Sequence, residues 1–93
     1  MGNKFCAADH LKIGSIKVVV DLHTIPLSVG NVRKIMDAAI HAMQDNDLQE
    51  ITVITTGYDQ TRDTIMAGYD CHRYGSQHIH YRLVNPKYDD NQF

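Results

Sequence analysis

The sequence has no tryptophan, and it holds only two cysteines and two prolines among 93 residues. Cys6 and Cys71 stand far apart, so they form no disulfide framework, and reduced thiols in a cytoplasmic protein are the favoured interpretation. No apolar run approaches the ~20 residues that a membrane span needs. An apolar secretory segment is also missing at the N-terminus. These absences predict a cytoplasmic domain that makes no membrane contact.

A strong excess of charge of either sign is absent too. Lys and Arg number 9, Asp and Glu number 11, and the formal net charge is −2. A general basic field for nucleic acid is therefore excluded, and the chain is too weakly acidic to mimic DNA by charge alone. Any nucleic-acid contact would need a local basic patch or a small contact area. The hydrophobic share of 43% is that of an ordinary globular protein.

What is present predicts one α/β domain over residues 16–84, between an N-terminal segment (1–15) and a polar C-terminal tail (85–93). The segment Ile16–His23 reads IKVVVDLH, and its three consecutive valines are β-branched. Both faces of this strand are apolar, which suits a central strand covered on both sides. Pro26 marks the break after it.

A helix is expected from about Val29 to Gln44, with Ser28 as its N-cap. Its apolar residues recur at helical spacing: Val29, Val32, Met36, Ala39, Ile40 and Met43. Two methionines of this stripe are interpreted as core fillers, and His41 as a solvated surface residue. A second strand is expected at Glu50–Thr55. Strand, helix and strand together indicate a right-handed βαβ unit with parallel strands.

The rest of the chain predicts a short helix that Asp59 caps and that runs through Ala67, with Gly68 as its stop. A loop over 69–77 and a third strand at His78–Val84 are expected after it. In that strand Tyr81 is expected in the core. The fold class is therefore α/β, with a βαβ core, a three- to four-stranded mainly parallel or mixed sheet, and two helices.

Sites in open α/β sheets form at the carboxyl ends of the parallel strands. Asp21 and His23 share a face there, so His23 could act as general acid or base while Asp21 sets its tautomer. The alternative is that Asp21 caps the loop and His23 binds backbone. After the second strand, Gly57 permits a tight turn, and the next helix N-terminus offers amides to an anion. The expected substrate contacts are Thr56, Gly57, Tyr58 and Arg82.

His78 and His80 alternate on one strand, a spacing that can chelate zinc or another divalent metal. The alternative is that both histidines and Arg82 form the polar face of an edge strand. The direction of this strand decides between them: only an antiparallel strand would bring His78 and His80 toward Asp21. A divalent metal is the one cofactor that these residues suggest.

Two motifs resemble those of the Smr domain. They are Val20–Thr24 (VDLHT), at the end of the hydrophobic strand, and Thr56–Asp59 (TGYD), at the later turn. Thr24 and the pair Tyr58-Asp59 stand where the family pattern has glycines. The resemblance implies nucleic-acid binding and endonuclease activity, with Asp21 and His23 at the matching positions.

The sequence thus predicts an Smr-like domain that interacts with nucleic acid, as a phosphodiesterase or endonuclease using Asp21 and His23. The alternative is a non-enzymatic protein-binding module that modulates or inhibits a larger partner protein. Tyr69 and Tyr74, in a loop with Arg73, are of the residue types that anchor such interfaces. The sequence does not indicate an oligomeric state.

Overall fold

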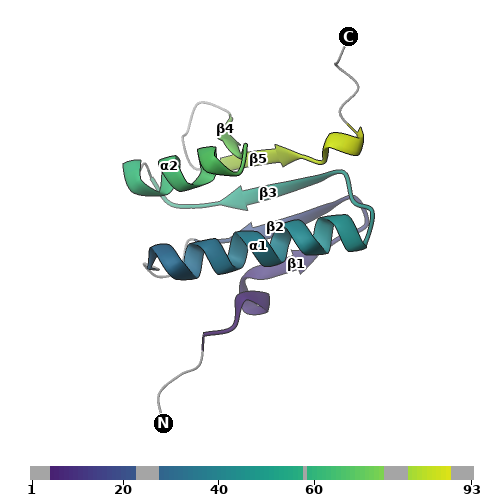
Figure 1. Ribbon diagram of the computed structural model, residues 1–93, viewed down its shortest axis with the longest axis horizontal. Coiled ribbons are helices and arrows are strands. Elements are labelled where there is room, and N and C mark those ends of the chain that lie inside the picture. The colour runs from purple at the N-terminus through teal and green to yellow at the C-terminus, as the bar shows by residue number, and fades with distance from the viewer. Residues whose placement is uncertain (1–4, 23–27, 58, 75–79, 89–93) are drawn as a thin grey trace.

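The chain forms a single α/β domain built on one five-stranded sheet (Figure 1). The computed structural model describes residues 5–22, 28–57, 59–74 and 80–88. The elements in chain order are the 3-10 helix η1 (Ala7–His10), β1 (Leu11–Ile13), β2 (Lys17–Asp21), α1 (Val29–Asp45), β3 (Glu50–Ile54), α2 (Gln60–Gly68), β4 (His72–Arg73), β5 (His80–Val84) and the 3-10 helix η2 (Pro86–Tyr88). Within these ranges no helix is long and apolar enough to cross a membrane.

The sheet is mixed, with strand order β1-β2-β3-β5-β4. Strands β2 and β3 are parallel and are joined by α1, which confirms the predicted βαβ unit. The other strand pairs, β1 with β2, β3 with β5 and β4 with β5, are antiparallel. The sheet therefore has more strands than the three or four predicted.

Strands β1 and β4 are the additions that the sequence did not predict. Strand β1 lies in the predicted N-terminal segment, and β4 lies in the predicted loop over 69–77. Strand β1 (LKI) alternates over three residues only, and β4 (HR) has no apolar residue, so neither has an alternation long enough to reveal a strand in a sequence. Both are defined by backbone pairing to a longer neighbour.

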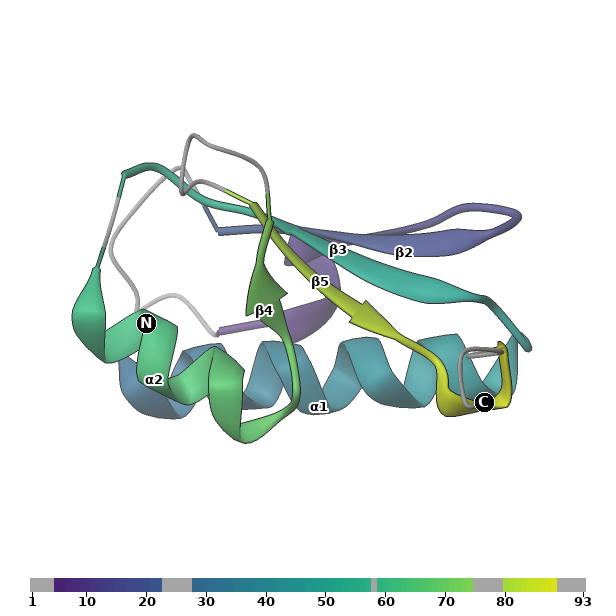
Figure 2. The same cartoon turned by 90° about the horizontal axis from the view of Figure 1, so that it is seen from above.

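The domain has two layers, because α1 and α2 lie on the same side of the sheet (Figure 2). Val18 and Val20 are fully buried under the helices, whereas Val19, on the other face, is only half-buried. The expectation that β2 is covered on both sides is therefore wrong for the described residues. Valine favours strands because it suits a half-buried pleated surface, so a run of valines does not reveal how many faces are covered.

The core lies between α1, α2 and the helix-facing side of the sheet. It includes Val18, Val20, Val32, Ile35, Met36, Ala39, Met43, Ile51, Val53, Met66, Tyr81 and Leu83. Met36 and Met43 fill the core as predicted, and His41 is exposed as predicted. Val29 departs from the predicted stripe, since 43% of it is exposed at the first turn of α1.

Both predicted N-caps are confirmed. Ser28 Oγ accepts a hydrogen bond of 3.1 Å from a first-turn amide of α1, and Asp59 Oδ1 accepts one of 3.0 Å in α2. Helix α2 ends at Gly68, as predicted, but the left-handed residue that follows is Asp70, with φ 62°. Asp47 (φ 56°) takes the same conformation after α1, which Asp adopts more readily than most residues.

The first residues after β5 hold the loop between α1 and β3. Asn85, which is 7% exposed, donates from Nδ2 to Leu48 O at 2.8 Å and from its backbone amide to Gln49 O at 2.8 Å. In η2, Lys87 Nζ lies 2.6 Å from Asp47 Oδ1. The start of the predicted C-terminal tail therefore belongs to the fold.

We expect the two cysteines to differ sharply in reactivity. Cys6 is exposed, whereas burial of Cys71 raises the pKa of its thiol from 9.0 to about 12. Because the thiolate is the nucleophile, Cys71 is inert in the folded protein. Titration with a chromogenic disulfide at pH 8 should find one reactive thiol, and two in denaturant. The Cys6→Ser variant should show no reactive thiol until it unfolds; rapid labelling of Cys71 in that variant would contradict its burial.

Candidate functional site

The carboxyl ends of β2 and β3 meet at one edge of the sheet, and β5 begins there. Asp21 pairs with Ile54 on one side, and Ile54 pairs with His80 on the other. Directly opposed residues share a face, so these three form one row on the side away from the helices. Strand spacing places the Cα atoms of Asp21 and His80 about 10 Å apart. The antiparallel direction of β5 thus brings His80 to the Asp21 end.

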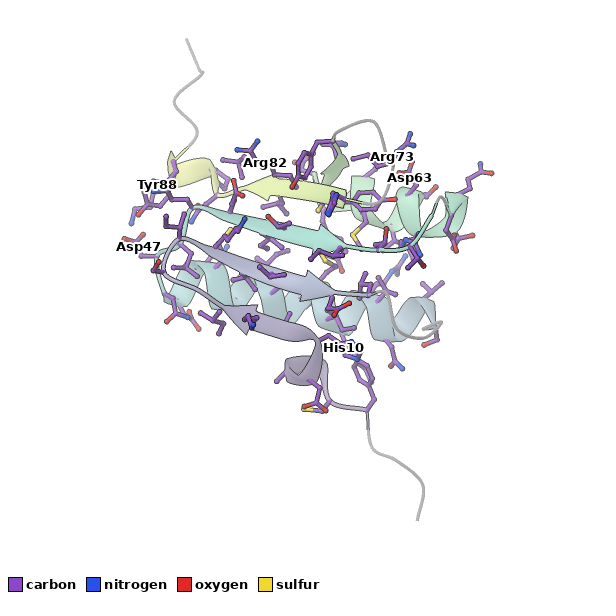
Figure 3. All side chains as sticks on the ribbon, turned by 180° about the vertical axis from the view of Figure 1, so that it is seen from behind. His10, Asp47, Asp63, Arg73, Arg82 and Tyr88 are labelled. Atoms are coloured by element: carbon purple, nitrogen blue, oxygen red, sulfur yellow. The ribbon has the colours of Figure 1, made fainter. Side chains whose placement is uncertain are left out.

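Asp21 is half-buried and has a histidine beside it that the sequence did not place there. His10 Nδ1 lies 3.1 Å from the backbone oxygen of Asp21. A carbonyl only accepts, so Nδ1 is the donor of this hydrogen bond. The His10 ring, which is labelled in Figure 3, stacks on Phe5 with ring centroids 5.8 Å apart. The pairing of β1 with β2 creates this contact, and no spacing in the sequence indicates it.

The turn after β3 is held by an arginine from α2. Gly57 has φ 63°, a conformation that glycine adopts without steric cost. Arg62 Nη2 donates to Gly57 O at 2.8 Å and to Thr56 O at 3.3 Å. Arg62 was not predicted as a site residue, and its i+5 spacing from Gly57 has meaning only once the turn is known. Thr56 is exposed at this edge.

A shallow open groove of about 380 Å³ lies between the first turns of α1 and α2. Its lining residues are Val29, Arg33, Gln60, Thr61, Thr64 and Ile65. The N-terminal end of α1, capped by the neutral Ser28, carries partial positive charge, and Arg33 adds a full one, whereas the Asp59 carboxylate offsets the positive end of α2. The groove therefore combines a guanidinium, hydroxyls and the positive end of α1, which favour an anion, beside the carboxyl ends of β2 and β3. None of these lining residues was predicted as a binding residue.

Arg82 lies one row away from Asp21 and His80 on the same face of the sheet. It pairs with Thr52, and its Nε donates to Glu50 Oε1 at 2.9 Å. About half of the Arg82 side chain, 51%, remains exposed. The structure thus places Arg82 on the sheet face (Figure 3) and Thr56 and Gly57 in the turn beyond the strand end.

A polar cluster on the helix side ties α2 to β4 and β5. Asp63 Oδ1 accepts from Tyr81 OH at 3.0 Å and from Arg73 Nε at 3.0 Å. Burial, followed by the bond to Asp63, raises the pKa of Tyr81 to about 12. Tyr81 is 1% exposed, so its prediction as a core residue is confirmed. The cluster gives the Tyr81 hydroxyl, the one polar atom of this buried ring, a hydrogen-bond partner. Its role is therefore structural.

Three predicted site residues, His23, Tyr58 and His78, lie outside the described residues. Across the part of the chain that is described, no group of three or more His, Cys, Asp or Glu could hold a metal ion. His80 instead contacts the Tyr74 ring, with centroids 5.8 Å apart. No protein-family model, curated protein or solved structure matches the chain.

Proposed function

We propose that the chain is an Smr-like domain that interacts with nucleic acid at the carboxyl edge of its sheet. The observation that carries the proposal is the groove between the N-terminal turns of α1 and α2, with Arg33 in its wall. Support also comes from the two motif positions, because Asp21 ends β2 and the Thr56-Gly57 turn follows the adjacent parallel β3.

Phosphate oxygens are the natural ligands for this edge. Most protein–DNA hydrogen bonds go to phosphate and sugar, and helix N-termini and Arg side chains supply many of them. Thr61 and Thr64 add hydroxyl donors to the groove wall. Since the chain has a net charge of −2, we expect few phosphate contacts and therefore modest affinity.

Cleavage of the bound strand is the second part of the proposal. Following the motif, His23 accepts a proton from the attacking oxygen, the new bond forms at phosphorus, and the P–O bond to the leaving oxygen breaks. Asp21 orients the imidazole. The leaving oxygen takes up a proton from water, and the hydroxide that this leaves takes back the proton held by His23.

Arg33 provides the direct test of binding. Fluorescence anisotropy with labelled single-stranded and structured RNA and DNA should show binding that weakens with salt. Arg33→Ala is expected to lower the slope of log K against log salt by about 1, the effect of losing one phosphate contact. Lys34→Ala is the matched control, because Lys34 is the next cation along α1, is exposed and does not line the groove. Equal effects of the two substitutions would refute the groove as the binding site.

Cleavage is tested separately on the same substrates, with and without divalent metal. The double variant Asp21→Ala/His23→Ala should lose cleavage while it keeps salt-dependent binding. Cleavage that survives the double substitution would remove these residues from the mechanism. If the native protein shows no salt-dependent binding to any nucleic acid, the proposed function is wrong.

A protein-binding module is the second candidate function. It is favoured by Ile13 and Ile16 at the β1–β2 connection, which are 53% and 55% exposed. Exposed apolar residues that lie together mark protein contacts more often than isolated ones do. A partner that binds the native chain but not the Ile13→Ser/Ile16→Ser variant would support this function.

A further inference from the structure

One face of the sheet is not covered by either helix, and its residues can be assigned from the strand register. Opposed residues form one row across it: Lys12, Val19, Thr52, Arg82 and His72. A second row, nearer the carboxyl edge, consists of Asp21, Ile54, His80 and Tyr74. We call these two rows, together with Lys17, Glu50 and Val84 of the next row, the open face.

We propose that the open face binds unpaired bases of a single-stranded nucleic acid, with Tyr74 and His80 as the stacking platform. This inference rests on the proposed function and names its substrate class. The Tyr74 amide donates to His80 O at 3.1 Å, which places the two residues opposite each other at the end of the β4–β5 pair. Their rings are 5.8 Å apart and inclined by 38°. Tyr74 is 43% exposed, so its ring offers a surface to a base.

The charges of the open face complement a phosphate backbone. Lys12, Lys17 and Arg82 are exposed cations. The carboxylates on the same face are recessed: Asp21 is half-buried, and the Glu50 side chain is 20% exposed and bonded to Arg82. A negatively charged strand therefore meets the cations first, although the whole chain has a net charge of −2.

Apolar contact alone does not account for the open face. Val19 and Ile54 are half-buried, and Thr52 is 6% exposed. Val84 is 39% exposed, but it pairs with Glu50 at the end of β5 away from Tyr74, so the described residues present no broad apolar surface for a protein partner. Exposed rings set among cations are the arrangement that holds single strands, because every base has a face that can stack. Paired bases in a duplex keep their faces covered by their neighbours and cannot reach Tyr74.

The open face also leads to the candidate catalytic edge. Asp21 and His80 belong to the same row, separated by Ile54 on the central strand. A strand whose base stacks on Tyr74 and His80 can therefore extend along this row to Asp21 and the Thr56-Gly57 turn. Recognition of the base and contact with the phosphate would then involve one continuous strand.

The test uses single-stranded RNA and DNA that contain 2-aminopurine, together with duplexes of the same sequence. Stacking on the protein should change the probe's fluorescence in single strands only. Tyr74→Ala should raise the Kd for single strands about 5- to 150-fold, the loss expected for one stacked base. Tyr74→Phe should bind as the native protein does. Tyr88→Ala is the matched control, because Tyr88 lies in η2 near the opposite end of β5.

The outcomes separate this inference from the proposed function. Salt-dependent binding that Tyr74→Ala leaves unchanged would overturn the open face as a stacking platform while the proposed function stands. Equal affinity for duplex and single strand would likewise overturn the stacking platform and leave the proposed function standing. A native protein that binds no nucleic acid would overturn both. Loss of single-strand affinity in Tyr74→Ala, but not in Tyr74→Phe or Tyr88→Ala, would establish the stacking platform.

Discussion

Replacing Ile51 with alanine is expected to lower the free energy of unfolding by about 2–5 kcal/mol. Ile51 is fully buried in β3, where it lies between Val18 of β2 and Leu83 of β5. Truncation removes apolar contacts and leaves a cavity that neighbouring strands on both sides cannot close. Small domains have only about 5–15 kcal/mol of stability, so this single change removes a large fraction of it. Denaturant unfolding followed by circular dichroism measures the loss.

The control for this prediction is the same substitution at an exposed isoleucine. Ile16 is 55% exposed, and Ile16→Ala should change the stability by about 0.5 kcal/mol or less. A loss below about 1 kcal/mol for Ile51→Ala would mean that β3 is not the central strand of the packed core.

Replacing Asn85 with alanine is expected to cost about 1–3 kcal/mol, a large effect for a residue outside the apolar core. The Asn85 amide donates to Leu48 O in a buried hydrogen bond of 2.8 Å. Asn85 Oδ1 also accepts from the Lys87 amide at 3.1 Å. Alanine leaves the Leu48 carbonyl buried without this donor and removes the cap of η2. The same unfolding measurement detects the loss.

Lys87→Ala is the control, because it removes a contact to the same loop at the surface. The Lys87 and Asp47 side chains are 65% and 58% exposed, so solvent screens their ion pair and Lys87→Ala should lower the stability much less than Asn85→Ala does. The hydrogen bond from Lys87 holds the pKa of Asp47 below 3.8. Its contribution is therefore present above pH 3.8 and is lost as the pH falls further. An equal loss for both variants would contradict the distinct role of Asn85.

The sequence predicted the elements whose apolar patterns are strong. Helix α1 was placed within one residue of its observed end, and β2 and β3 were placed with the correct parallel direction. The apolar periodicity of α1, β2 and β3 reflects their packing, because each of these elements buries one face against the other layer. Strand β1 buries only part of Leu11, and both residues of β4 are exposed, so the positions of these strands depend mainly on pairing with a neighbour.

The candidate site was predictable only in part for the same reason. Asp21 and the Gly57 turn could be placed, since the carboxyl ends of parallel strands mark the site in this class of fold. The neighbours of those residues depend on the long-range arrangement of the chain. His10 reaches Asp21 through β1, and Arg33 meets the start of α2 only because both helices lie on one face. The position of His80 depends on the direction of β5, and the residue pattern of β5 does not indicate that direction.

The shortness of the outer strands has a further consequence, for behaviour at high concentration. The sheet ends on one side with the three residues of β1 and on the other with the two residues of β4. A long free strand edge templates the addition of another chain and leads to fibrils, whereas a short edge offers few backbone groups for such pairing. A domain that leaves one sheet face uncovered by helices can therefore remain monodisperse, because growth along the edges is disfavoured.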